Sequence, residues 1–285
     1  MQVKSRIISN ITSASKDMND RNLPAFAASV AFFFFISFIP TLMFGFSLMK
    51  YLPFSKQEVV DVLVTSLPGA VENPIKSIAD EIYQVSGTVI PVALILTLWT
   101  AGKGMLGLVR GLNGILGLTD KRNFIVIRLV SVLYTLSFLA FIAVSILLAM
   151  FSHKIGIWMD NNLEYISPIL HFLFKFRDVI ICVFLTILLM LVYAFMPAER
   201  QKFTYQIPGA LFGAVGWVLM TKLFNLYLDI FDGFSTYGSL TTIIVILFWL
   251  DLIFTIILIG AYINMKYSAG IFEKHKEKRN RRIKK

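Results

Sequence analysis

Cysteine, histidine and charged side chains are all scarce in this sequence of 285 residues. With Cys182 as the single cysteine, neither an intrachain disulfide nor a cysteine-based zinc site can form. The three histidines, His153, His171 and His275, are scattered, and the sequence contains no HExxH, Walker A or GxSxG motif. We therefore expect no metal site, no cofactor and no enzymatic activity, and we do not expect ATP-driven pumping by this chain alone.

Apolar residues are correspondingly abundant. They make up 57% of the chain while charged residues make up 15%, whereas a soluble domain is about a quarter charged. A helix needs about 20 largely apolar residues to cross a bilayer. Six stretches meet this requirement: roughly 24–49, 88–108, 126–152, 178–196, 207–228 and 240–264. Because an open sheet would leave backbone groups unpaired in lipid, the sequence predicts an all-α integral membrane protein with about six transmembrane helices.

Lysine and arginine predict the orientation of these spans. With the N-terminus inside, most of them fall in the N-terminal segment, in the loops after the second and fourth spans, and in the C-terminal tail. The loop after the second span contributes Arg110, Lys121, Arg122 and Arg128. Both termini are therefore predicted to be cytoplasmic. No cleavable signal peptide is evident, because the first 23 residues are polar and charged.

This pattern predicts one membrane domain, 24–265, between a cytoplasmic N-terminal segment, 1–23, and a basic cytoplasmic tail, 266–285. Two outer segments, 55–85 and 153–177, are long enough to form more than linkers. The second is rich in aromatic residues, which favour the membrane interface. Each segment is expected to lie on the outer surface, either as a lid over a cavity or as packing.

The segment 55–85 is predicted to hold two short amphipathic helices. "SKQE" is typical of a capping box, in which Ser55 and Glu58 bond each other's backbone. After a Pro-Gly turn, Asn73 is predicted to cap the second helix with Pro74 at its first position.

Three spans in each half permit an inverted repeat. One short echo favours it: "WTAGK" in the second span, with Trp99 and Lys103, against "WVLMTK" in the fifth, with Trp217 and Lys222.

Asp251 is the strongest functional signal, because it lies inside the apolar run "LFWLDLIFTI". An acidic side chain at a bilayer centre costs about 2.5–3.5 kcal/mol, so it should face protein or a watery cavity and have a partner. Lys222 and Lys103 are the candidate partners, and Asn225 and Tyr237 complete the predicted substrate-binding set. The alternative is a purely structural ion pair, or a neutral Asp251 that is hydrogen-bonded to a neighbour.

Glycines and one proline are the other intramembrane features. Gly102 and Gly104 surround Lys103, and Gly209 and Gly213 are four residues apart in the fifth span. Such small residues favour close helix packing, with a glycine-lined cleft for a phosphate around Lys103 as the alternative. Pro40 should interrupt and kink the first span.

The tail "KHKEKRNRRIKK" is strongly basic and includes Arg279, Arg281 and Arg282. Next to a membrane, such a cluster is expected to contact anionic lipid headgroups. Basic clusters also bind RNA, but no RNA-binding motif accompanies this one. The expected partners are therefore membrane lipids and no nucleic acid, and nothing in the sequence specifies an oligomeric state.

Three segments carry a family resemblance: "LTLWTAGKGMLGLVRGLNGILGL", "YAFMPAERQKFTYQIPGALFGAVGWVLMTKLFNLYL" and "TYGSLTTIIVILFWL…LIGAYIN". They resemble the YihY/BrkB family of bacterial inner-membrane proteins, from about Ala25 to Asn264. The resemblance implies a six-helix fold, a plasma-membrane location, links to virulence and the cell envelope, and a suggested role in moving lipids or envelope precursors. The family once carried the name ribonuclease BN, a tRNA-processing nuclease, but the clustered His and Asp ligands of a metallonuclease are missing here.

Two positions depart from the family pattern. Tyr262 stands where the family often has Glu in "GAEIN", and Asp251 stands where an aromatic residue is common. The two positions are eleven residues apart and share a helix face, so the acid is displaced towards the membrane centre.

Together these features predict a transporter or flippase for an anionic amphipathic lipid or envelope precursor. An ion or small-solute channel or exchanger is the main alternative. A membrane scaffold whose basic tail recruits a partner ranks third, and a tRNA nuclease ranks last.

Overall fold

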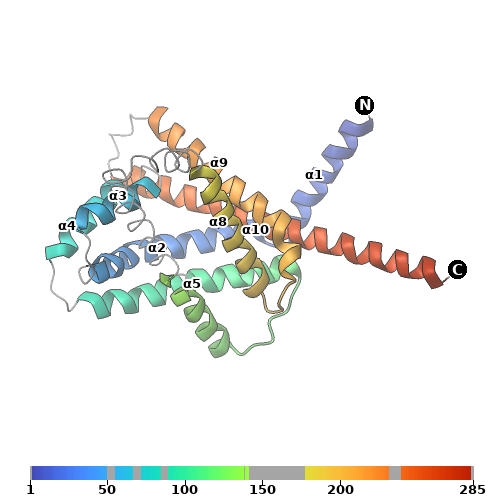
Figure 1. Cartoon of the computed structure of the whole chain (residues 1–285), viewed down its shortest axis with the longest axis horizontal. Coiled ribbons are helices and arrows are strands. Elements are labelled where there is room, and N and C mark those ends of the chain that lie inside the picture. The colour runs from blue at the N-terminus through green and yellow to red at the C-terminus, as the bar shows by residue number, and fades with distance from the viewer. Residues whose placement is uncertain are drawn as a thin grey trace, which may run out of the picture.

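The computed structural model of this chain is built from helices, and it contains no strand in the part that it describes (Figure 1). That part comprises residues 2–49, 55–66, 72–84, 89–137, 139–140, 177–230 and 239–283. The predicted all-α class is confirmed. The aromatic segment 153–176 and Tyr237 lie outside the described residues.

Helices cover the described parts of the predicted apolar stretches, while residues 138 and 141–152 of the third stretch lie outside the described residues. Their bounds are α1 (Gln2–Asp20), α2 (Leu23–Met49), α3 (Lys56–Ser66), α4 (Glu72–Gln84), α5 (Val89–Leu116), a helix over Phe124–Ser137, α8 (Arg177–Phe195), the short 3₁₀ helix η2 (Phe203–Gln206), α9 (Ile207–Ile230) and α10 (Ser239–Ile283). Within the described residues, three stretches are long and apolar enough to cross a membrane: Leu23–Phe44, Phe203–Tyr227 and Ile243–Gly270. The total of six spans stays a prediction.

The termini and the short helices lie at opposite ends of the bundle. Figure 1 shows α1 and the C-terminal part of α10 extending from one end, and α3 and α4 lying at the other. The predicted boundary between membrane domain and tail falls inside α10, which is one continuous helix from Ser239 to Ile283. The N-terminal segment is also helical over most of its length.

α2 and α5 pack closely because glycines on α5 leave room for large side chains on α2. A Cβ atom on Gly104 would approach the Phe34 ring to 2.7 Å, and one on Gly107 would approach the Val30 side chain to 3.2 Å. In lipid there is no hydrophobic drive between helices, so this kind of close van der Waals contact holds them together. The buried residues of this contact continue into α8, α9 and α10 as one core.

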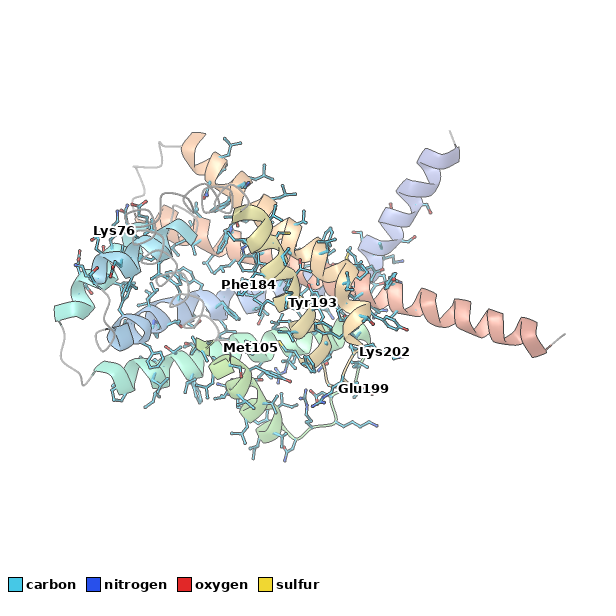
Figure 2. The ribbon with its side chains drawn as sticks, in the orientation of Figure 1. Lys76, Met105, Phe184, Tyr193, Glu199 and Lys202 are labelled. Atoms are coloured by element: carbon cyan, nitrogen blue, oxygen red, sulfur yellow. The ribbon has the colours of Figure 1, made fainter. Side chains whose placement is uncertain are left out.

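α9 and α10 cross at two glycines, Gly209 and Gly260. A Cβ atom on Gly209 would collide with the Gly260 carbonyl oxygen. The Gly209 N–H donates a hydrogen bond to Asn264 Oδ1 of α10 at 2.7 Å. Nearby, the Tyr193 hydroxyl of α8 donates to the Ile257 carbonyl of α10 at 2.6 Å. Figure 2 shows Tyr193 in the middle of the molecule, where these helices converge. Three helices are thus joined at one point.

The predicted capping box at the start of α3 is present. The Ser55 N–H donates to Glu58 Oε2 at 2.8 Å, and the Glu58 N–H donates to Ser55 Oγ at 3.3 Å. α4 begins at Glu72, two residues before the predicted first position at Pro74. Asn73 and Pro74 therefore lie within the first turn of the helix.

α3 and α4 lie against the end of α2 through a second apolar core. It consists of Leu42, Phe46, Val59, Val60, Ile75, Ala79 and Ile246. An ion pair between Lys56 and Asp80 also joins the two helices. Pro40 lies within α2, which continues on both sides of it, and the predicted kink at this position stays a prediction.

The crossing of α9 and α10 generates a stability prediction. Gly209→Ala should lower the free energy of unfolding by about 1–3 kcal/mol, because the added methyl group meets backbone that cannot move without separating the helices. Thermal unfolding of the purified protein in detergent measures the effect. Gly270→Ala is the matched control, since nothing lies within 4 Å of the added methyl group there. Equal melting temperatures for the two variants would contradict the packing role of Gly209.

Candidate functional site

Asp251 lies on α10 and is half-buried. It shares a helix face with Ile244 and Phe248, which are both exposed. Within the described part of the chain, no hydrogen bond or ion pair reaches its carboxylate. Asp251 therefore pairs with neither of the two lysines in this conformation, and its role in substrate binding stays a prediction.

The other members of the predicted set are dispersed. On α9, Lys222 is exposed and Asn225 is half-buried. The two members of the sequence echo also differ in their surroundings: Trp99 is exposed and contacts Lys103, whereas Trp217 packs edge-on against the buried Trp249. The tail residues Arg279, Arg281 and Arg282 lie near the end of α10, but their side chains are not among those described.

Lys103 is half-buried on α5 and held by aromatic rings. Its Nζ atom lies 5.5 Å from the centroid of the Phe33 ring and 5.5 Å from that of the Trp99 ring. Gly102 lies beside Lys103, and a Cβ atom added to it would lie 3.5 Å from the side chain of Val132 on the helix over Phe124–Ser137. Gly213 faces Leu189 of α8 in the same way at 2.7 Å. These glycines lie in helix contacts.

A polar cluster joins α1 to α10, and the sequence patterns alone do not reveal it. Asp17 accepts hydrogen bonds from Arg21 Nε at 2.8 Å, from the Tyr262 hydroxyl at 2.9 Å and from Lys266 Nζ at 2.8 Å. These donors, Lys266 first and then Arg21 and Tyr262, hold the pKa of the Asp17 carboxyl well below its usual range. The available signal was Tyr262, at the position where the family pattern has Glu.

The same cluster borders a hollow and reaches a third helix. The hollow has a volume of about 540 Å³ and is lined by Ser13, Ala14, Asp17, Tyr262 and Lys266. Arg21 also donates to the Ile115 carbonyl at the end of α5, at 2.6 Å. α1 is thus tied to both α5 and α10.

A second polar cluster lies in the turn after α5. Asp120 accepts two hydrogen bonds from the Arg122 guanidinium, at 2.8 and 2.5 Å, and one from Asn113 Nδ2 at 3.3 Å. Arg122 holds the pKa of Asp120 below its usual value, and Asp120 raises the pKa of Arg122. Asn113 also accepts a hydrogen bond from the Ala198 N–H at 2.7 Å. Two of the motif segments quoted above, around Asn113 and around Ala198, are therefore bonded to each other.

Charged side chains gather at both ends of the bundle. Figure 2 shows Lys76 at the end where α3 and α4 lie, and Glu199 and Lys202 near the end from which α10 extends. Over the described ranges, no group of three His, Cys, Asp or Glu side chains is arranged to hold a metal ion.

The junction of α1 and α10 yields a prediction for Asp17→Asn. Loss of the carboxylate removes the ion pairs to Lys266 and Arg21, so the backbone amides of α1 should exchange hydrogen faster at neutral pH. Because the pKa of Asp17 is lowered, its contribution in the wild type is complete above the ordinary value of about 3.9 and is lost only as the pH falls through the lowered value. Hydrogen exchange read by mass spectrometry measures both effects.

Asp20→Asn, on the exposed side of the same helix, is the control and should exchange like the wild type. If Asp17→Asn also exchanged like the wild type, the network would not hold α1 in place.

Comparisons with known proteins agree with the sequence motifs. The family described as Virulence factor BrkB matches residues 14–284. A "Putative ribonuclease-like protein YfkH" of Bacillus subtilis is 30% identical over 240 residues, which cover 84% of this chain and 87% of that protein. A "UPF0761 membrane protein" of Idiomarina loihiensis is 32% identical over 103 residues, covering 36% of this chain and 35% of the relative. No solved structure matches the chain.

The family match covers nearly the whole chain and includes every motif on which the resemblance rested. Together with the apolar helices, it confirms a multi-pass membrane protein. The chain belongs to the BrkB family.

Proposed function

We propose that this protein is a transporter or flippase that moves an anionic amphipathic lipid or envelope precursor across the bacterial plasma membrane. The observation that carries the proposal is the position of Lys103. It lies about 20 Å along the helix from either end of α5, and no carboxylate pairs with it in the described part of the chain. A cation at membrane depth is costly unless it meets an anion or water, and intramembrane charges of this kind mark substrate pathways.

The arrangement of the ends supports an orientation with both termini in the cytoplasm. The basic end of α10 and the helix α1 extend from one end of the bundle (Figure 1). Basic segments remain on the cytoplasmic side of bacterial inner membranes. In this orientation the arginines Arg279, Arg281 and Arg282 would contact anionic lipids of the inner leaflet.

In the proposed mechanism the headgroup leaves one interface and meets Lys103 while its acyl tails stay in lipid. The phosphate would replace the aromatic rings as the main partner of the ammonium group, since a charge-assisted hydrogen bond is stronger than a cation–π contact. Asp251 would exchange a proton between states, and Lys222 would receive the headgroup on α9. Lys103, Asp251 and Lys222 are thus proposed to act in sequence along the path of the headgroup.

An ion or small-solute channel or exchanger is the second candidate. The half-buried Asp251 favours it, because a carboxylate at membrane depth without a protein partner is suited to a cation or a proton. This candidate predicts conductance or pH-dependent ion flux in planar bilayers without any added lipid substrate. The lipid transporter predicts none.

A proteoliposome assay tests the proposed function. Fluorescent anionic lipids in the inner leaflet become accessible to a membrane-impermeant reductant only after they cross the bilayer. The wild-type protein should move these lipids to the outer leaflet, where the reductant quenches them. Lys103→Met, Lys222→Met and Asp251→Asn should each reduce the rate of quenching to that of protein-free vesicles. The reason is that each substitution removes a charge that the headgroup or proton requires.

Lys202→Met is the control, because Lys202 is exposed near the end of the bundle and contacts Tyr205. It should leave the rate unchanged. Wild-type rates in all three site variants would remove these residues from the mechanism, and ion conductance without lipid movement would replace the transporter by the channel.

A further inference from the structure

Two cations from different helices meet at one tryptophan. Lys103 of α5 lies with its Nζ atom 5.5 Å from the centroid of the Trp99 ring. Arg128, on the helix over Phe124–Ser137, has its Cζ atom 5.0 Å from the same centroid. An Arg128 guanidinium nitrogen also donates a hydrogen bond to the Trp99 carbonyl at 3.1 Å. This places Arg128 against the middle of α5, although the sequence assigned it to a cytoplasmic loop.

The surroundings of this pair are apolar and open to lipid. Trp99 is 61% exposed. The large apolar side chains next to Arg128 in the sequence are also exposed: Phe124, Ile125, Val126 and Leu129. Phe33 of α2 closes the other side of Lys103. Across the residues with described side chains, neither Lys103 nor Arg128 forms an ion pair with a carboxylate. Among the described side chains, two positive charges therefore lie at one exposed apolar surface without a carboxylate partner.

Two acidic clusters near the ends of the helices provide a contrast to this pair of cations. Asp17 and Asp120 lie in polar clusters near the ends of the helices, and each is paired with an arginine. Lys103 and Arg128 have ring faces and one carbonyl oxygen instead. A ring face stabilises a cation only partly, and it leaves most of the N–H donors of both side chains unused.

The unused donors fit a phosphate group. The planar guanidinium of Arg128 offers paired N–H groups that match two phosphate oxygens, and the ammonium of Lys103, which lies against the same indole, adds further donors. The exposed Trp99 ring between them suits the polar-apolar boundary of a lipid, where headgroup and chains meet. Two cations favour a headgroup with net negative charge over a zwitterionic one, because the ammonium of the latter would be repelled.

We propose that Lys103, Arg128 and Trp99 form a lipid-facing site that binds the phosphate of an anionic phospholipid headgroup. The inference rests on the proposed function and specifies which groups hold the headgroup. Arg128 and Trp99 are its new members, and neither Asp251 nor Lys222 is required for binding.

Fluorescence quenching tests the site with the full chain in lipid nanodiscs. The probes are brominated phosphatidic acid and brominated phosphatidylcholine with identical acyl chains, each diluted into unbrominated phosphatidylcholine. Bromine quenches tryptophan only near contact, and the difference between wild type and Trp99→Phe isolates the signal of Trp99. In the wild type, brominated phosphatidic acid should quench Trp99 at a much lower mole fraction than brominated phosphatidylcholine does.

Arg128→Gln and Lys103→Gln should each weaken this preference about tenfold or more, the effect expected when a hydrogen bond to a charged group is lost. Arg128→Lys should restore part of it, because the charge returns without the paired donors. Arg110→Gln, an exposed arginine further along α5, is the control and should keep the wild-type preference. Gel filtration and the melting temperature identify any variant that fails to fold, and the folded Lys103 and Arg128 variants then decide the result.

Three outcomes would overturn the site: equal quenching by the two lipids in the wild type, an unchanged preference in both glutamine variants, or full displacement of the brominated lipid by soluble glycerol phosphate, which would make the ligand a solute. The transport assay separates this inference from the function on which it rests. Anionic lipid binding without lipid movement would refute the transporter and keep the site. Lipid movement that survives Lys103→Gln together with Arg128→Gln would keep the transporter and refute the site.

Discussion

Close contact between helix backbones is the constraint on which this structure depends. Apolar side chains in lipid gain little from meeting one another, so the helices must fit closely to stay together. The α9–α10 crossing shows how this is achieved, because Gly209 and Gly260 leave only enough room for backbone. Asn264 and Tyr193 then add hydrogen bonds from side chains to the backbone at the same point. The packing of α5 on α2 follows the same rule with phenylalanine against glycine.

The polar residues of the chain fall into two classes with different surroundings. Near the ends of the helices, Asp17 and Asp120 are paired with arginines and join segments that are far apart in the sequence. These clusters hold α1, the turn after α5 and the Ala198 loop in place, which gives several motif residues a structural role. Among the described side chains, Lys103 and Arg128 have the Trp99 ring as a neighbour and no acid in an ion pair. The contrast is what makes the second class a candidate site for a ligand.

The distribution of charge also connects the fold to the proposed function. A headgroup that crosses a bilayer needs polar partners along its path, while its chains need an opening to lipid. The Trp99 ring is exposed on α5, and the two half-buried cations Lys103 and Arg128 lie against it. Asp251 occupies a separate position on α10, on a face that includes Phe248.

The sequence by itself determined the solvent, the class of fold and much of the local structure. Apolar length predicted the helices, and the pattern of Ser55 and Glu58 predicted a cap that the structure contains, because these features depend on residues close in the chain. Only the tertiary structure decided which charges meet. Arg128 lies twenty-nine residues from Trp99 in the sequence, and Asp17 lies 245 from Tyr262, so no local periodicity could bring either pair together. The partners of a charge depend on how the helices cross, and glycines on the packed faces allow the close contacts at those crossings.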